Sequence, residues 1–275
     1  MSDVDRITTI EPRTSLRSDL LEILTTANVG ALLAWRNVLV VYKQTFFGVA
    51  WALIRLAAMT LVLAALYFRG RGGGGPLPSA GLFLLAGVIP MQFFVQCVAN
   101  VSDSLLANSN VITKVYFPKI WVMIAATAQA VADLLVAVPC LVAGLCFFGP
   151  GVSLRLLALP LLVVFALLAS LSVSLPIAIY VVRYRDIKHA LPFALQLAYF
   201  VGPVAYDSST LEGPLKWAVL LFPATGLVEA FRWVCFSELA FPATAVAVSL
   251  ASTAVLSVAG LASLRRFQAS IVDRL

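Results

Sequence analysis

Apolar stretches long enough to cross a lipid bilayer follow one another along most of this 275-residue chain. A helix needs about 20 apolar residues to cross the hydrocarbon core, and within lipid only helices or closed barrels satisfy the polar groups of the backbone. The stretches are continuous and lack the alternation of a barrel strand. With 61% hydrophobic and 12% charged residues, the composition is also far from that of a soluble domain. The sequence therefore predicts an all-α, polytopic membrane protein.

The apolar stretches predict six transmembrane helices. A shorter stretch, His189–Tyr206, contains helix-breaking residues, and a longer one, Leu215–Phe236, has Pro223 in its middle with Glu229 and Arg232 behind it. A proline and a charge pair in one apolar stretch are typical of two half-helices that enter the membrane and return. We therefore count His189–Tyr206 as a span and the longer stretch as re-entrant, beside five plain spans at Gly48–Phe68, Gly81–Asn100, Ile120–Phe148, Leu156–Val182 and Ala243–Leu264.

The distribution of Lys and Arg supports this count. Six spans with both termini inside place 14 of the 19 basic residues on the inner side, whereas a seventh span at Leu215–Phe236 would give 11 against 8. The positive-inside rule therefore favours six spans, with an external re-entrant segment at about residues 208–241. The net charge of +6 then reflects topology and contact with anionic lipid rather than binding of nucleic acid.

The N-terminal region predicts a helix that lies in the membrane interface. Apolar residues such as Leu24, Leu32 and Trp35 interleave with polar ones over residues 16–45, which is typical of an interfacial helix; a soluble helix beneath the membrane domain is the alternative. The first twenty residues are rich in charge and are not expected to form a signal peptide. The predicted organisation is a cytoplasmic N-terminal region with the interfacial helix (1–47), a six-span membrane domain (48–264) and a cytoplasmic tail (265–275).

We expect no catalytic, cofactor-binding or metal-binding residues in this chain. The four cysteines have no metal-ligand spacing, and the glycine run at residues 70–75 lacks the Gly-Lys-Ser/Thr ending of a phosphate loop. Asp133 is the one acid near the middle of a plain span, and Gln129 precedes it by one helical turn. We interpret this pair as a hydrogen-bonding site between helices; a proton site is the alternative.

Three motifs lie on the side that charge assigns to the cytoplasm: Tyr42–Trp51, Asn108–Pro118 and Tyr184–Pro192. Together with the interfacial helix and the broken segment, they resemble the permease subunits of ATP-binding-cassette polysaccharide exporters, which carry O-antigen, capsule or teichoic acid. The resemblance covers nearly the whole chain. It departs at Phe222, where the family often has Asn before the proline of the broken segment, and at Leu56, near which a common proline is missing.

The resemblance implies a homodimer of this subunit, bound to two copies of a separate ABC ATPase that binds ATP and Mg. The substrate would be a lipid-linked polysaccharide, of the O-antigen type first and of the capsule or teichoic-acid type as an alternative. The location would be the bacterial inner membrane, with both termini cytoplasmic. An ion-coupled carrier would need inverted repeats and intramembrane charge pairs, and a membrane glycosyl or phosphoglycosyl transferase would need paired acids or a metal motif.

The same resemblance, joined to the chemistry of the residues, predicts four groups of functional residues. Coupling to the ATPase is expected from the loop after the second span and from the third motif, at Asn108, Asn110, Thr113, Lys114, Tyr116, Phe117, Arg185 and Asp186. The substrate entrance is expected at cations and a tryptophan near the first span, at Arg36, Lys43, Trp51 and Arg55. Aromatic rings on which sugars slide are expected at Phe93, Phe94, Phe193, Tyr199 and Phe200, and an external gate at Pro223, Gly226, Glu229 and Arg232.

Overall fold

The computed structural model describes residues 26–43, 48, 50–70, 77–112, 118–149, 151 and 153–272, and these residues contain helices, turns and no strand. The first part of the predicted interfacial helix, the glycine run and the tail's last residues lie outside them. The helices are α2 (Ala27–Lys43), α3 (Ala50–Gly70), α4 (Leu77–Ala107), α5 (Ser109–Ile112), α6 (Ile120–Ala126), α7 (Ala128–Phe148), η1 (Leu154–Ala158), α8 (Leu159–Arg183), α9 (Asp186–Val201), η2 (Ser208–Thr210), α10 (Gly213–Leu220), α11 (Pro223–Cys235) and α12 (Ala243–Val272).

Five helical segments of the described chain are long and apolar enough to cross a membrane, which confirms the five plain spans. Their bounds differ from the prediction by a few residues at most ends, and the second reaches seven residues further, to Ala107. The third combines α6 and α7, which meet at Thr127. The segments are Ala50–Arg69, Ala80–Ala107, Ile120–Phe148, Leu154–Arg183 and Ala243–Leu264.

The sixth predicted span corresponds to α9, which is shorter and displaced along the sequence. The helix begins at Asp186 and ends at Val201, so its 16 residues reach about 24 Å. The predicted range ran on to Tyr206, but the backbone turns extended at Gly202, because the residue before a proline avoids helical geometry. The structure thus places residues 202–206 in a turn rather than in the helix.

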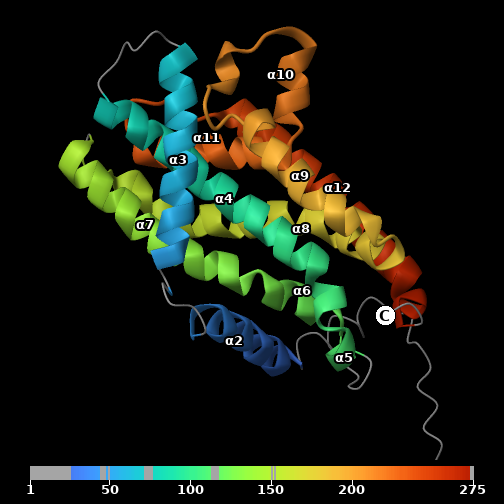
Figure 1. Ribbon diagram of the computed structural model, residues 1–275. Helices are drawn as coiled ribbons and strands as arrows, with labels where there is room; N and C mark the ends of the chain where they lie inside the picture. The colour runs from blue at the N-terminus through green and yellow to red at the C-terminus, as the bar shows by residue number, and fades with distance from the viewer. Residues whose placement is uncertain are drawn as a thin grey trace, which may run out of the picture.

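The broken segment before the last span is a pair of short helices, α10 and α11, bent by 85°. Pro223 starts α11, and Phe222 before it is extended, since proline suits the first helical turn and disfavours helix at the preceding residue. The second half-helix is buried against α4, α8 and α12. In Figure 1, α10 lies at the upper edge, opposite α2, α5 and the end of α12.

Helix α2 lies across the lower end of the bundle in Figure 1 and packs on α6. The Trp121 indole donates to the Thr26 hydroxyl (3.1 Å), and the Asn37 amide donates to the Ala125 carbonyl (3.1 Å). Gly30 faces the Trp121 ring so closely that a Cβ atom there would lie 2.1 Å from Cε3. The outer face exposes apolar side chains such as Leu32 and Trp35, which is the pattern of a helix lying in the interface.

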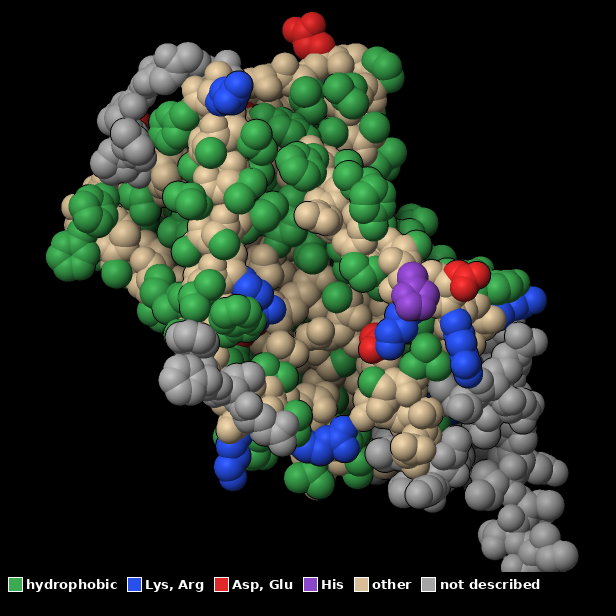
Figure 2. Space-filling view, in the orientation of Figure 1, with side chains coloured by type: hydrophobic (Ala, Val, Ile, Leu, Met, Phe, Trp, Pro, Cys, Tyr) green, Lys and Arg blue, Asp and Glu red, His purple; other side chains and the backbone are tan. Residues whose placement is uncertain are grey.

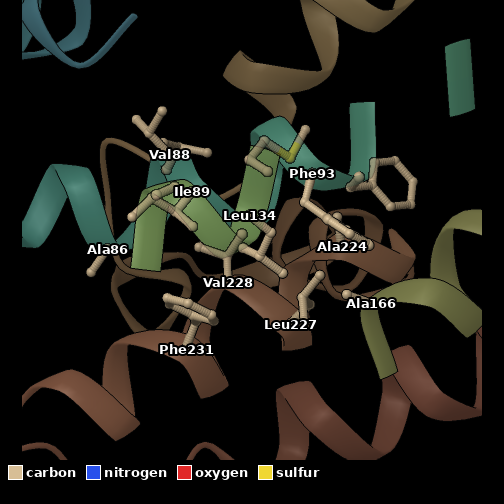
Figure 3. Packing of buried hydrophobic residues seen from close by; sticks show 14 of the residues in the cluster. Ala86, Val88, Ile89, Phe93, Leu134, Ala166, Ala224, Leu227, Val228 and Phe231 are labelled. Atoms are coloured by element: carbon tan, nitrogen blue, oxygen red, sulfur yellow. The ribbon is translucent and has the colours of Figure 1, made fainter. Parts of the chain in front are cut away.

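The hydrophobic core gathers around α4 and α11. Figure 3 shows Ile89 and Phe93 of α4 beside Leu134 of α7 and beside Leu227 and Val228 of α11. A second buried cluster joins the lower half of α4 to α6, α8 and α12. Helix α4 therefore contacts most of the bundle and is the element around which the remaining spans are placed.

A labelling experiment tests the predicted orientation of these helices. Cysteine introduced at Glu212, which is exposed at the start of α10, should react with an impermeant thiol reagent added outside. Cysteine at Asp273, beyond the described residues, should react only after permeabilisation, because both termini are expected inside. A background lacking the four native cysteines serves as the control, and external labelling at position 273 would contradict the six-span arrangement.

Candidate functional site

A groove of about 480 Å³ lies between α4, α8 and α9. At one end, Lys188 Nζ lies 2.7 Å from the Asp103 carboxylate; at the other, the Tyr199 hydroxyl donates to the Gln92 side chain. These ends are eleven residues apart on each helix, or about 16 Å. Between them the walls carry aliphatic residues and the Gln196 amide. We call this space the α4–α9 groove.

A polar stripe formed by Gln92, Gln96 and Asn100 runs along α4. Their four-residue spacing places the three side chains on one face of the helix. The Asn100 amide donates to Gln129 of α7 (3.3 Å), which confirms Gln129 as a hydrogen-bonding contact between helices. Figure 2 shows a hollow between α3 and α9 whose floor is largely polar side chains and backbone, while apolar side chains cover the surface above it and charged side chains lie beside and below it.

Three elements meet at a cluster formed by Tyr42, Arg55 and Asp133, which we call the corner cluster. Arg55 Nη2 of α3 donates to Asp133 Oδ2 of α7 at 2.8 Å, and the Tyr42 hydroxyl at the end of α2 donates to Asp133 Oδ1. Burial, followed by the hydrogen bond to Asp133, raises the pKa of Tyr42, so the phenol remains a donor. The buried carboxylate thus has two partners, and its interpretation as a site joining helices is confirmed.

A small cavity of about 20 Å³ borders the corner cluster between α3, α4 and α7. Arg55 Nε and Gln96 Nε2 are both buried without a hydrogen-bond partner among the described residues, and both side chains line this cavity. A cavity of this size holds one water molecule, which could accept from both groups. The Arg55 side chain is 35% exposed, so part of it remains accessible.

The predicted coupling residues lie at the lower end of the bundle, as far as the structure describes them. Arg36 Nη2 of α2 donates to Asn108 Oδ1 at 2.7 Å, so a predicted entrance residue contacts a predicted coupling residue. Asn110 is exposed in α5, and Arg185 and Asp186 are exposed where α9 begins. The other four predicted coupling residues, Thr113, Lys114, Tyr116 and Phe117, lie outside the described residues, and Lys43 and Trp51 are exposed at either end of the α2–α3 connection.

The five predicted aromatic residues do not form one surface. Phe93 and Phe94 are buried in the core, where Phe94 packs edge-on against Phe222 with ring centroids 5.4 Å apart. Phe193 and Phe200 are exposed on α9. Tyr199 is buried and borders the α4–α9 groove, so among the five it is the ring with a direct relation to that space.

The predicted external gate is held together by buried polar contacts. Arg232 is only 3% exposed and donates to the carbonyls of Val204 and Tyr206 in the turn after α9, while its guanidinium lies 3.8 Å from the centre of the Phe83 ring. Glu229 accepts from the Ser208 backbone (3.1 Å) rather than from Arg232. These residues therefore fasten the turn before η2 to α11 and α4.

Gly226 and Pro223 set the geometry of the bend itself. The Gly226 backbone N–H donates to Ser249 Oγ of α12 at 2.8 Å, so the two helices lie very close there.

A further polar contact lies at the C-terminal end of α11. Arg155 donates to the carbonyls of Trp233, Phe236 and Leu239 and lies over the Trp233 ring. Sequence reasoning missed Arg155, since a basic residue just before a span reads as an ordinary flanking charge.

Sequence reasoning also missed the polar stripe, although a signal was present. Amides at positions 92, 96 and 100 inside one apolar stretch have the spacing of a single helix face and are uncommon in lipid-facing helices. The Arg55–Asp133 pair was missed because both residues were considered separately. No local spacing connects them, since their positions in the chain are 78 residues apart.

Comparison with known proteins places this helical arrangement in a family. Residues 30–236 match the ABC-2 type transporter family. The chain belongs to the ABC-2 type transporter family. It is 23% identical over 199 residues to an O-antigen export system permease protein RfbA of Klebsiella pneumoniae, covering 70% of this chain and 73% of that protein. It is 21% identical over 217 residues to the RfbA permease of Myxococcus xanthus, covering 78% and 82%.

Subunits of the ABC-2 type transporter family are membrane transport components, and the present chain is accordingly a multi-pass membrane protein and a permease subunit. The family match spans α3 to α11 and most of α2. The α4–α9 groove, the corner cluster and the bent pair therefore all lie within the part of the chain that the ABC-2 family defines.

Proposed function

We propose that this ABC-2 permease subunit exports a lipid-linked polysaccharide of the O-antigen type across the bacterial inner membrane, driven by ATP. Both similar permeases named above are O-antigen export proteins. Capsule and teichoic-acid polymers are the alternative cargo. In this arrangement both termini are cytoplasmic, and α10 and α11 lie at the external end.

The polar stripe on α4 is the observation that carries this proposal. A polysaccharide presents hydroxyl groups in every direction, so it needs a hydrated wall with both donors and acceptors. The amides of Gln92, Gln96 and Asn100 supply both, and they lie within a span where polar residues mark transport pathways. The neighbouring groove adds the Gln196 amide and the Tyr199 ring.

The energy source in this proposal is a separate ATPase. We assign binding of ATP and Mg to two copies of an ABC ATPase that attach to a dimer of the permease. The contact would include Asn108 and Asn110 at the lower end of α4 and α5, and Arg185 and Asp186 at the start of α9. These groups are exposed or partly exposed at the same end of the molecule as α2, which is where a partner on the cytoplasmic side would dock.

An ion-coupled carrier fits the structure less well. It would need an acid within the membrane that gains and loses a proton during transport. Asp133 is placed at a suitable depth, but its carboxylate already has Arg55 and Tyr42 as partners.

Co-purification and glycan analysis together test the proposed function. The permease should co-purify with an ABC ATPase expressed from the same genome, and a strain lacking the permease should accumulate lipid-linked glycan on the inner side of its inner membrane. Sugar analysis of that material identifies the cargo and distinguishes O-antigen from capsule and teichoic acid. Accumulation of no glycan, together with a transport defect that follows an ion gradient, would contradict the proposal.

The substrate entrance gives a further prediction, centred on Arg55. Its guanidinium is partly exposed near the inner end of α3, at a depth that a lipid diphosphate can reach, and Arg binds such a group through its planar fork. Arg55→Lys should export more slowly than wild type, and Arg55→Gln more slowly still. Export is measured as glycan reaching the outer side per assembled complex, and wild-type export by both variants would exclude the recruiting role.

A further inference from the structure

The corner cluster lies at the junction between the interfacial helix and the first span. Tyr42 is the penultimate residue of α2, and Arg55 is the sixth residue of α3. Gly48 between them has a positive φ of 47°, so the chain changes direction sharply there. Asp133 of α7 bonds to residues on both sides of this junction, and it therefore fixes the end of α2 and the start of α3 at once.

The two oxygens of Asp133 divide these tasks. Oδ1 accepts from Tyr42 and Oδ2 accepts from Arg55, so neither partner displaces the other. The Arg55 ion pair is partly exposed on the Arg side, and a charged hydrogen bond of this kind contributes more than a neutral one. Loss of the Tyr42 bond leaves Arg55 bound to Asp133 but separates both from α2.

The middle of α2 is connected to the region that we assign to the ATPase. Arg36 bonds to Asn108 at the end of α4, and Asn37 bonds to α6. A displacement of this region therefore moves α2 through direct contacts, and α2 passes the displacement to Asp133 through Tyr42. Hydrogen bonds at Arg36 and at Tyr42, joined by the rigid helix α2 between them, thus connect Asn108 to Asp133 and Arg55.

We propose that Asp133 is a positioning residue that makes the placement of Arg55 depend on helix α2, so that movement at the ATPase contact resets the substrate entrance. The inference rests on the proposed function, because it assigns to Arg55 a place beside the phosphate groups of the cargo lipid. When α2 and Tyr42 are in place, Asp133 holds Arg55 against α7. When α2 moves, Tyr42 draws the Asp133 carboxylate with it, and Arg55, which is bound to the other oxygen of that carboxylate, changes position.

The test measures coupling in the complete exporter. The complex of permease and ATPase is placed in lipid vesicles with the lipid-linked glycan isolated from the deletion strain, and the amount of glycan moved per ATP hydrolysed is determined. Tyr42→Phe and Asp133→Asn should each lower this ratio roughly fivefold or more, the lower end of ordinary coupling between sites, while ATP hydrolysis continues. The ratio of the double variant should be no lower than that of Asp133→Asn alone, because both changes act on the same hydrogen bond between Tyr42 and Asp133.

Tyr206→Phe is the matched control. It removes a phenol hydroxyl that donates to the carbonyl of Val201 (2.6 Å), the last residue of α9, and it should leave the amount of glycan moved per ATP unchanged. A merely structural role would lower hydrolysis and export together and keep their ratio, which would overturn the inference. A wild-type amount of glycan moved per ATP in Tyr42→Phe would overturn it as well. If the wild-type complex moves no glycan, the proposed function itself fails; if it does and the variants match it, only this inference fails.

Discussion

Arg232→Met should destabilise the folded permease by about 3–6 kcal/mol. The buried guanidinium makes two short hydrogen bonds, to the carbonyls of Val204 and Tyr206, and a longer one (3.4 Å) to the Phe83 carbonyl. A short bond to a charged donor contributes about 1.5–3 kcal/mol. Met has a similar length but no donor, so both carbonyls would stay buried without a partner. The stacking of the cation on Phe83 would also be lost. The variant should melt well below wild type in a thermal unfolding experiment on purified protein.

Lys216→Ala is the control for this prediction. Lys216 lies on α10, at the same end of the molecule as the Arg232 contacts, and is partly exposed. Its loss removes a positive charge from the external end without breaking a buried contact, so the melting temperature should stay close to wild type. Equal melting of Arg232→Met and Lys216→Ala would mean that the turn after α9 is held by other contacts.

Gly226→Ala should destabilise the same region by about 1–3 kcal/mol, the usual cost of overpacking a tight core. A Cβ atom at this position would lie 2.6 Å from the Ala245 carbonyl and 2.8 Å from Ser249 Cβ. Both belong to α12, and one is backbone, so the two helices must separate to make room. The bend between α10 and α11 depends on this contact, and export should fall together with the melting temperature.

Gly81→Ala is the matched glycine control. Gly81 also lies in a helix, α4, but a Cβ atom there would meet nothing within 4 Å. Ala has a better helix propensity than Gly by about 1 kcal/mol, so this variant should be as stable as wild type or slightly more stable. If Gly226→Ala behaved in the same way, close contact between α11 and α12 would not be what requires glycine at position 226.

The sequence was sufficient to predict the spans, because length and hydropathy are local properties of the chain. It also predicted the broken segment, because a proline inside an apolar stretch interrupts the helix. In the structure a new helix, α11, begins at Pro223. The end of α9 was harder to place. Apolar residues continue past Gly202, but the geometry before Pro203 ends the helix there, and hydropathy does not register that restriction.

The partners of charged residues were beyond local reasoning. Arg55 was recognised as a cation in need of an anion, but the anion supplied by the fold is Asp133, which reaches it only after α3 and α7 have packed. Arg232 and Glu229 are three residues apart and looked like a pair, yet each bonds to backbone from the turn or helix nearby. The partners of buried charges depend on how the helices pack in three dimensions. The burial of Phe93 and Phe94 depends on the same packing and could not be predicted from the local sequence.

The close approach of Gly30 to Trp121 has an optical consequence. The indole of Trp121 lies beneath the backbone of α2 and donates to Thr26, so its surroundings depend on whether α2 is seated on α6. Indole emission shifts to longer wavelength when the ring becomes wetter. A chain in which the other four tryptophans are replaced by Phe would therefore carry its own fluorescent reporter, and lifting of α2 during a transport cycle could be followed in real time without attaching a dye.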